Sequence, residues 1–390
     1  MTVLWRHRLQ SAVEAVINGP SRGPHPRLAR ALGLLATGYG GAMALRQGLY
    51  RHRFLTVGRL TCPVVSVGNL TVGGTGKTPL VVELARRLCT WGLRPVVISR
   101  GYRGRAERAG GVVSDGKRLR MGPEEAGDEP FMMAAELTRV PVVVGGDRFR
   151  AGCLAQSTFD PDVIVLDDAF QHIQLHRDIN LLVMDHRSPF GNGRLLPRGP
   201  LREPLSALTR ADAFILSGAG YETPAGDLPL PDWTHRLPGG RPVFRTYASL
   251  RVRQAAGFGG LSGCGPAFLP ANAETLYGRR GVAFSGIARN HRFIDGLNRL
   301  GLSVAHEFAY PDHHCYADAE LARIARTAMG KKADMVVTTE KDWARIFHRI
   351  DWPLPVVVVG IETGFGPRQA DFDRFIGQGL AVLGKQGGRY

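Results

Sequence analysis

Residues 73–78 read GGTGKT and lie between a predicted strand and a predicted helix. The strand is a valine-rich apolar run at 61–68, and the helix follows from the apolar spacing over 79–92. Glycine lets backbone N–H groups turn inward around phosphate oxygens, and the start of a helix adds positive potential there. We therefore predict a phosphate-binding loop, which consists of Gly73, Gly74, Thr75, Gly76, Lys77 and Thr78.

Lys77 and Thr78 have defined roles in a loop of this kind. The lysine reaches the β- and γ-phosphates of a nucleotide, and the hydroxyl of Thr78 binds Mg²⁺. The standard pattern GxxxxGK[ST] requires glycine at position 71, where this chain has Thr71. The pattern therefore fails at one position, while its context of strand, loop and helix is met.

Two carboxylates follow a second apolar run, because residues 163–166 lead directly into Asp167 and Asp168. A carboxylate at the carboxyl end of a strand can hold Mg²⁺ beside the phosphates. Together with the glycine-rich loop, this pair predicts a site for a nucleoside triphosphate with Mg²⁺. No asparagine is followed by lysine, so the guanine-reading Asn-Lys-x-Asp tetrad is missing and ATP is favoured over GTP.

Predicted strands alternate with predicted helices along most of the chain, which indicates an α/β fold with parallel sheets covered by helices. A helix is expected over 124–137 and a strand over 334–342. Residues 218–280 are rich in proline and glycine and are interpreted as loops between domains. The expected parts are an N-terminal region at 1–55, a P-loop domain at 56–217, a connecting segment at 218–280, a smaller α/β domain at 281–367 and a terminal helix and tail at 368–390.

The charge balance is strongly positive, since 50 Lys+Arg against 34 Asp+Glu give +16. This surplus favours an anionic partner, namely nucleic acid, an acidic membrane surface or a phosphorylated substrate. An arginine-rich composition bias is the alternative. The five cysteines are scattered and form no CxxC pair, which argues against a disulfide framework or a zinc ribbon and fits a reducing cytoplasm.

An uncharged segment near the N-terminus, residues 31–45, is flanked by arginines at 27, 30, 46, 51 and 53. Its length is below the ~20 residues of a spanning helix, and its glycines weaken a helix. We interpret the segment as a helix in the membrane interface whose flanking arginines meet lipid phosphates. A helix docked on the protein's own core is the alternative.

Several segments taken together resemble the tetraacyldisaccharide 4'-kinases, the lipid A 4'-kinases of Gram-negative bacteria. They keep the family's order over residues 66–345 and so cover most of the chain. The segments are SVGNLTVGGTGKTP (66–79), SRGYRG (99–104), GDEP (127–130), DDAFQH (167–172), GNGRLLPRGPLREP (191–204), FSGIARNHRF (284–293), PDHHCY (311–316) and TTEKDWAR (338–345). The chain departs from the family at Ala169, where glycine is usual, and at Arg198, where a small residue is usual.

The resemblance implies an ATP-dependent lipid kinase that moves the γ-phosphoryl group to the 4'-hydroxyl of a tetraacyl glucosamine disaccharide 1-phosphate in lipid A biosynthesis. It also implies two α/β/α sandwich domains, the first P-loop-like, joined by a short two-stranded β linker, with the active site in the cleft between them. The implied location is the cytoplasmic face of the bacterial inner membrane, as a peripheral or monotopic protein on an anionic membrane surface. No recognisable motif supports a nucleic-acid partner.

The resemblance also assigns roles to single residues. Asp128 of GDEP is the general base for the sugar hydroxyl, and His313 of PDHHCY assists it. Asp167 serves Mg²⁺ together with Thr78. Asp168 serves the metal or orients the acceptor, and it stays an alternative general base.

Further residues are expected near the site. Arg202 is a candidate clamp for the transferred phosphate, and the alternative is a structural pair with Glu203 or another acid. Tyr102 and Gln171 lie on loops expected to rim the site. The Lys-Asp pair at 341–342 is functional by resemblance, with an ion pair at a domain interface as the alternative.

Two other functions stay open at this stage. One is a P-loop kinase or ATPase that acts on a soluble acceptor, for which lipid would be irrelevant. The other is a nucleotide-regulated module that binds a membrane or nucleic acid through its basic surface and phosphorylates nothing, with a steep salt dependence.

Overall fold

The structure, a computed structural model, describes residues 12–13, 15–17, 19, 25–218, 229–255, 268–287, 290–312, 314–347 and 349–387. Its internal contacts divide the chain into two compact units. The first contains Met1–Val81, Asp162–Tyr247 and Gly364–Tyr390, and the second contains Val82–Pro161 and Ala248–Thr363. Each unit is therefore assembled from stretches that are distant in the sequence.

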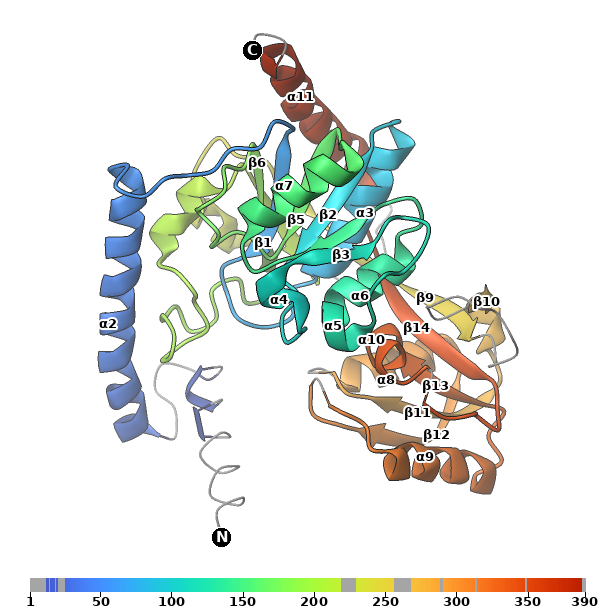
Figure 1. Cartoon of the computed structure of the whole chain (residues 1–390). Helices are drawn as coiled ribbons and strands as arrows, with labels where there is room; N and C mark the ends of the chain where they lie inside the picture. The colour runs from blue at the N-terminus through green and yellow to red at the C-terminus, as the bar shows by residue number, and fades with distance from the viewer. Residues whose placement is uncertain are drawn as a thin grey trace. The chain divides into compact units, whose positions relative to one another are not determined.

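Parallel strands form the centre of the first unit. In spatial order they are β5 (Val163–Asp167), β1 (Val64–Asn69), β6 (Ile179–Asp185), β7 (Ala213–Ser217) and β8 (Val243–Arg245). Val65 of β1 pairs with Val165 of β5 and with Ile179 of β6, so β1 lies between these two strands (Figure 1). β1 and β5 are buried along their whole length, which explains their continuous runs of valine, isoleucine and leucine.

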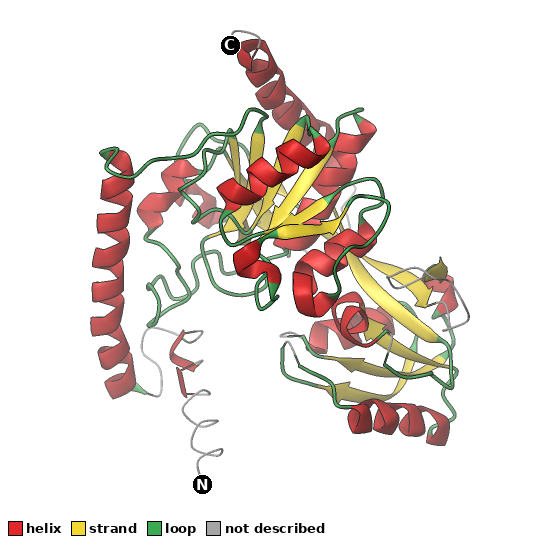
Figure 2. Ribbon diagram, viewed as in Figure 1, coloured by secondary structure: helices red, strands yellow, loops and turns green. Residues whose placement is uncertain are grey.

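The N-terminal helix α2 (Pro26–Arg51) is the long helix at the left of Figure 2. It extends beyond the uncharged segment 31–45 at both ends, because the flanking arginines, leucines and glutamine are good helix formers. Ala36 is its one buried residue. By length and composition, α2 is the one helix in the described part of the chain that could cross a membrane.

Other helical segments cover the first unit. They are α3 (Lys77–Thr90), which continues into the second unit, and η1 (Leu205–Arg210), η2 (Asp232–Arg236), η4 (Gly366–Arg368) and α11 (Gln369–Gly387). The aromatic ring of Phe244 on β8 contacts the rings of Phe365 and Phe372, with centroids 6.2 Å and 5.3 Å apart. This cluster fixes the start of the C-terminal helix against the sheet.

The second unit contains three strands in the spatial order β3 (Gly111–Ser114), β4 (Val142–Val144) and β2 (Pro95–Ser99). β2 and β4 are parallel, and β3 is antiparallel to β4. The helices of this part are α4 (Ala106–Ala109), α5 (Pro123–Ala126), α6 (Asp128–Glu136) and α7 (Arg148–Phe159). Asp147 caps α7, because its side chain accepts from the N–H groups of Phe149 and Arg150.

The prediction of a single helix over 124–137 is wrong, because two short helices, α5 and α6, occupy this stretch. Gly127 separates them with φ of +88°, a left-handed conformation that glycine adopts without strain. A Cβ at this position would lie 2.9 Å from the carbonyl oxygen of Tyr102. The break therefore fixes the first residue of α6, which is Asp128.

The second unit also contains a six-stranded sheet. Its spatial order is β10 (Phe268–Pro270), β9 (Tyr247–Ala255), β14 (Val356–Gly364), β13 (Met335–Thr339), β11 (Arg280–Ser285) and β12 (Ser303–Ala309). The last four are parallel, and β10 is antiparallel to β9. The connecting helices are α8 (Asn290–Arg299), α9 (Asp318–Gly330), α10 (Glu340–Ile346) and the short η3 (Ala273–Thr275). The alternation of strands and helices predicted from the sequence is thus also found in this part of the chain.

Two expectations need correction. Residues 218–280 are more than loops, since they contain β8, β9 and β10. The strand expected over 334–342 ends at Thr339, whose hydroxyl accepts from the N–H of Asp342 and so caps α10. The domain boundaries and the two-stranded linker expected from the sequence stay predictions.

A close approach at the end of β1 generates a stability prediction. A Cβ at Gly68 would lie 2.6 Å from the backbone nitrogen of Phe170, in the segment that carries Asp168. We expect Gly68→Ala to lower the free energy of unfolding by about 1–3 kcal/mol, because the backbone of β1 or of this segment must shift. Urea denaturation measures the loss.

Gly74→Ala is the matched control, because nothing lies within 4 Å of a Cβ built at that position. Its unfolding free energy should stay within about 0.5 kcal/mol of the original protein. Equal stability of the two variants would contradict the close approach at Gly68.

Candidate active site

The glycine-rich loop joins the end of β1 to the start of α3. Gly73 and Gly76 adopt φ of +112° and +77°, conformations that other residues rarely take. Thr75 is buried, whereas Gly73, Gly74 and Gly76 are exposed, so the loop backbone faces solvent between them. This arrangement leaves peptide N–H groups at the start of α3, where an anion is favoured.

Side chains from two strands hold the loop from inside. The buried amide of Asn69 donates to the carbonyl of Thr71, at 2.6 Å, and to the hydroxyl of Thr75, at 3.0 Å. The hydroxyl of Ser217, at the end of β7, donates to the carbonyl of Thr75 at 2.6 Å. Sequence reasoning missed both residues, although Asn69 lies within the SVGNLT segment.

Thr71 takes the place where the standard pattern requires glycine. Its backbone forms an antiparallel bridge with Leu201. The neighbouring N–H of Val72 donates to Pro200, and the N–H of Arg202 donates to Leu70, both at 2.8 Å. The chain at 71 is therefore extended and paired, and it does not need the conformational freedom of glycine.

Two cations meet at the carboxylate of Asp168. The Nζ of Lys77 lies 3.6 Å from Oδ1, and Nη1 of Arg202 lies 2.9 Å from both oxygens. Asp168 itself has φ of +47°, which is uncommon for aspartate and marks a turn directly after β5. Gln171 completes the group, because its Oε1 accepts from Arg202 at 3.4 Å and its Nε2 donates to the carbonyl of Asn69 at 2.7 Å.

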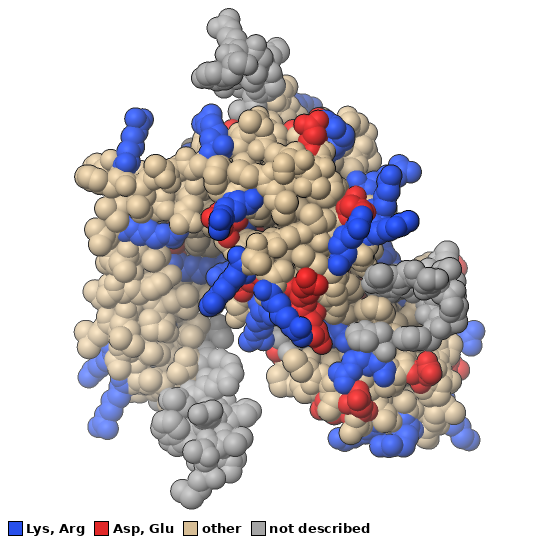
Figure 3. All heavy atoms as spheres, in the orientation of Figure 1, with Lys and Arg blue, Asp and Glu red and all other residues tan. Residues whose placement is uncertain are grey.

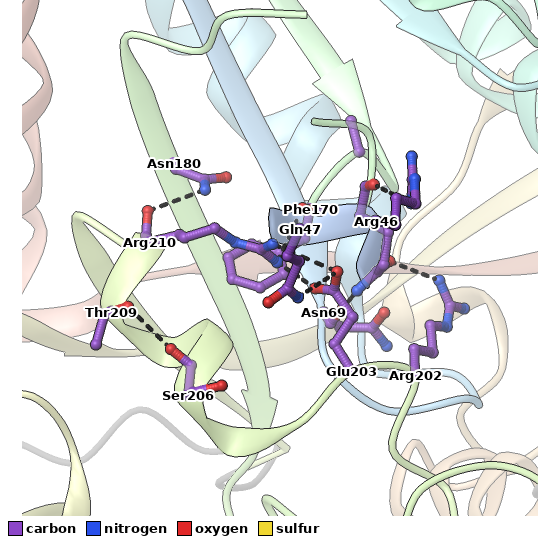
Figure 4. Close-up of polar contacts among 12 residues, drawn as sticks. Arg46, Gln47, Asn69, Phe170, Asn180, Arg202, Glu203, Ser206, Thr209 and Arg210 are labelled. Carbon is purple, nitrogen blue, oxygen red and sulfur yellow. Dashed lines mark hydrogen bonds and ion pairs between the residues drawn. The ribbon is translucent and has the colours of Figure 1, made fainter. Parts of the chain in front are cut away.

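Glu203 is not the partner of Arg202. It is buried and forms an ion pair with Arg210, whose guanidinium lies 4.7 Å from the ring centroid of Phe170 (Figure 4). The acid that pairs with Arg202 is Asp168. Arg202 therefore lies beside the phosphate loop with its side chain oriented by a carboxylate.

The residues predicted to hold a metal suit Mg²⁺ in their chemistry. Asp167 is the last residue of β5 and is 1% exposed, and Thr78 is the second residue of α3. Mg²⁺ is usually bound by one or two carboxylates together with substrate phosphates and water. Among the described residues, no group of three or more His, Cys, Asp or Glu side chains is suited to hold a metal. None of the four described cysteines, Cys62, Cys89, Cys153 and Cys315, forms a disulfide.

The second unit contains Asp128, the first residue of α6, which forms an ion pair with Arg345 of α10. Burial lowers the pKa of Arg345, but the hydrogen bond with Asp128 and the nearby carboxylates outweigh it, so that the pKa lies above its ordinary value. Arg345 also donates to the carbonyl of His314 at 3.2 Å. Sequence reasoning missed Arg345, although it closes the TTEKDWAR segment. His313 lies outside the described residues.

The Lys-Asp pair of TTEKD has two separate partners within this unit. Lys341 pairs with Asp312 at 2.8 Å. Asp342 is fully buried and accepts from the N–H of Gly286 at 3.0 Å and from the hydroxyl of Thr339 at 2.6 Å. Asp342 therefore joins the start of α10 to the end of β11. Tyr102, which was expected near the site, is exposed.

The loop, the helix that follows it and the acid-terminated strand place this protein in the class of P-loop phosphotransferases. A family model described as Tetraacyldisaccharide-1-P 4'-kinase matches residues 28–381. The chain belongs to this family, which confirms the resemblance drawn from its sequence.

Similar proteins cover most of the chain. A tetraacyldisaccharide 4'-kinase of Desulfatibacillum aliphaticivorans is 43% identical over 316 residues, which are 81% of this chain and 83% of the relative. A tetraacyldisaccharide 4'-kinase of Pelobacter propionicus is 45% identical over 302 residues, or 77% and 79%. The crystal structure of the "apo" form of LpxK from Aquifex aeolicus in complex with ATP has a TM-score of 0.71 and 31% identity, and covers 90% of this chain and 99% of that one.

The pair between Arg202 and Asp168 generates a kinetic prediction. We expect Arg202→Lys to lower kcat/KM for ATP by about tenfold or more, because lysine keeps the charge but lacks the guanidinium group whose Nη1 contacts both oxygens of Asp168 and the side chain of Gln171. Steady-state kinetics with varied ATP measures the change.

Arg241→Lys is the matched control, since the half-exposed Arg241 pairs with Asp212 at 3.2 Å in the same unit. Its kcat/KM should stay within about twofold of the original value. A loss of the same size in both variants would contradict a specific role for Arg202.

Proposed function

We propose that this chain transfers the γ-phosphoryl group of ATP to the 4'-hydroxyl of tetraacyldisaccharide 1-phosphate, a step of lipid A biosynthesis. The observation that carries the proposal is the meeting of Lys77 and Arg202 at Asp168, directly beside the glycine-rich loop. Membership of the 4'-kinase family supplies the acceptor class. The alternative of a soluble acceptor has no comparable support.

The phosphate groups are held by the backbone N–H groups of residues 73–76 and by the start of α3. Lys77 neutralises the β- and γ-phosphates, and Arg202 meets the charge of the transferred group. Asp168 keeps both cations in place through its carboxylate. Thr78 and Asp167 would hold Mg²⁺, which when bound neutralises phosphate oxygens during transfer.

The acceptor needs a base, because a sugar hydroxyl is a weak nucleophile. We assign this role to Asp128, with assistance from His313 as the family resemblance implies. The hydroxyl oxygen forms a bond to the γ-phosphorus while its proton moves to the carboxylate and the bond to the leaving ADP breaks. Asp168, which pairs with Lys77 and Arg202, stays the alternative base; Asp128 also pairs with a cation, Arg345.

Phosphotransfer can be measured directly in mixed micelles with γ-labelled ATP, Mg²⁺ and tetraacyldisaccharide 1-phosphate. We expect a labelled lipid bisphosphate from the original protein. Lys77→Ala should reduce its formation by about 100-fold or more, because the charge at the β- and γ-phosphates is lost. A folded protein that binds ATP and labels no lipid would leave only the nucleotide site and favour a soluble acceptor.

The choice of base is tested by two isosteric variants. Asp128→Asn should lower kcat by about 10²–10⁴-fold while ATP binding stays unchanged, because the proton acceptor is removed. Asp168→Asn should instead weaken ATP binding, since Lys77 and Arg202 lose their common partner. Near-normal turnover of Asp128→Asn, with turnover lost and ATP binding kept in Asp168→Asn, would reverse the assignment.

The helix α2 is proposed to bind the anionic cytoplasmic face of the inner membrane. Its exposed side chains include Leu34, Leu35 and Leu45, which are 79%, 62% and 66% exposed. Figure 3 shows a mostly uncharged surface along this helix, whose charged residues are arginines near its two ends, at 27, 30, 46 and 51. An apolar face between basic ends suits the boundary of acyl chains and lipid headgroups.

The membrane proposal predicts that Leu34→Glu/Leu45→Glu lowers the partition of the protein onto vesicles of phosphatidylglycerol and phosphatidylethanolamine by about tenfold or more. Cosedimentation measures the bound fraction. Met329→Glu is the control, because Met329 is an exposed apolar residue on α9, away from α2 in the sequence. An original protein that stays in the supernatant would contradict membrane association.

A further inference from the structure

Three side chains of α2 contact two segments of the first unit, one with Arg202 and Glu203 and the other with Gln171. The hydroxyl of Tyr39 donates to the carbonyl of Arg202 at 2.7 Å. Gln47 donates to the carboxylate of Glu203 at 3.3 Å, and Arg46 donates to the carbonyl of Gln171 at 3.4 Å. Figure 4 shows Arg46 and Gln47 next to Arg202 and Glu203.

Two of the residues that receive these contacts, Arg202 and Gln171, belong to the network around Asp168. Arg202 contacts Asp168 directly, and Gln171 contacts both Arg202 and the carbonyl of Asn69. Glu203 is 1% exposed and is paired with Arg210. The three residues of α2 therefore act on the site through its supporting residues.

The apolar side of α2 is a different side of the same helix. Leu34 and Leu45 are eleven residues apart, which is close to three full turns, so they share one face. A different side of α2 contacts the segments that contain Arg202 and Gln171. That side carries Tyr39, Arg46 and Gln47. A helix is a stiff element, so a displacement of one face is passed to the other.

We propose that α2 is a positioning element for phosphoryl transfer, in which Tyr39, Arg46 and Gln47 hold the Arg202–Glu203 segment and Gln171 in their working arrangement. The lipid surface that binds the apolar face of α2 thereby also affects the rate of phosphoryl transfer. The second statement rests on the membrane association proposed above. Tyr39, Arg46 and Gln47 are positioning residues, because their contacts reach Asp168 only through other residues.

The contact of Tyr39 is the most specific of the three and can be removed without a change in shape. We expect Tyr39→Phe to lower kcat by about three- to tenfold, the effect of one hydrogen bond, with ATP and lipid saturating in mixed micelles. KM for ATP, the melting temperature and the partition onto phosphatidylglycerol–phosphatidylethanolamine vesicles should stay unchanged. A role limited to folding or to anchoring would change one of these three quantities.

Thr37→Val is the matched control, because it removes a hydroxyl from the same helix that donates to the carbonyl of Gly33 within α2. It should keep the original kcat. The same comparison in an Arg202→Lys background provides a second control. Since Tyr39 acts through the segment that carries Arg202, Tyr39→Phe should lower kcat by a smaller factor in the Arg202→Lys background than in the original protein.

Hydrogen exchange gives a readout that is independent of turnover. The N–H of Arg202 donates to Leu70 at 2.8 Å, and its exchange rate reports how firmly the segment is held. We expect vesicles to slow exchange over residues 199–204 in the original protein, and to slow it less in Tyr39→Phe.

The outcomes separate the two proposals. If the original protein does not bind vesicles, membrane association and the link to the lipid surface both fail. If vesicle binding is intact and Tyr39→Phe has the original kcat and exchange rates, the positioning role of α2 is overturned and membrane association stands. A kcat loss that appears only together with lost vesicle binding also overturns it, in favour of anchoring alone.

Discussion

The carboxylate of Asp168 determines where the cationic groups of the first unit lie. Asp168 directly follows the buried strand β5 and has a left-handed backbone conformation. Its carboxylate forms ion pairs with both Lys77 and Arg202. Charged donors that are fixed before the reaction do not have to reorganise when negative charge moves onto the transferred phosphoryl group. The other contacts of the site support this pair of cations: Gln171 orients Arg202, and Asn69 fixes the loop from which Lys77 begins α3.

A second, partly buried set of charges organises the other unit. Arg251 of β9 pairs with Glu136, at the end of α6, and with Glu340, at the start of α10. Burial raises the pKa of Glu340, as does the neighbouring carboxylate of Glu136, while Arg251 opposes this rise. Since Asp128 begins α6 and pairs with Arg345 of α10, the two helices are joined by ion pairs at both ends.

The sequence predicted the parts of this structure that depend on local patterns. The glycine-rich loop, the two carboxylates at the end of β5 and the helix over 31–45 all follow from short-range composition and spacing. The prediction of one helix over 124–137 did not account for Gly127, whose left-handed conformation divides the stretch into α5 and α6. The partners of Arg202 and Asp128 could not be predicted, because 34 and 217 residues separate the members of the two pairs. Such pairs are determined by the packing of whole elements.

The backbone pairing of Thr71 with Leu201 has a consequence for how proteins of this kind are recognised. The first glycine of the standard pattern serves a tight turn, and in this chain an extended strand-like bridge replaces that turn. Searches that demand the strict spacing would pass over any protein built in this way. A search rule that accepts either a glycine at the first position or a downstream segment able to pair with it would find both solutions to the same geometric requirement.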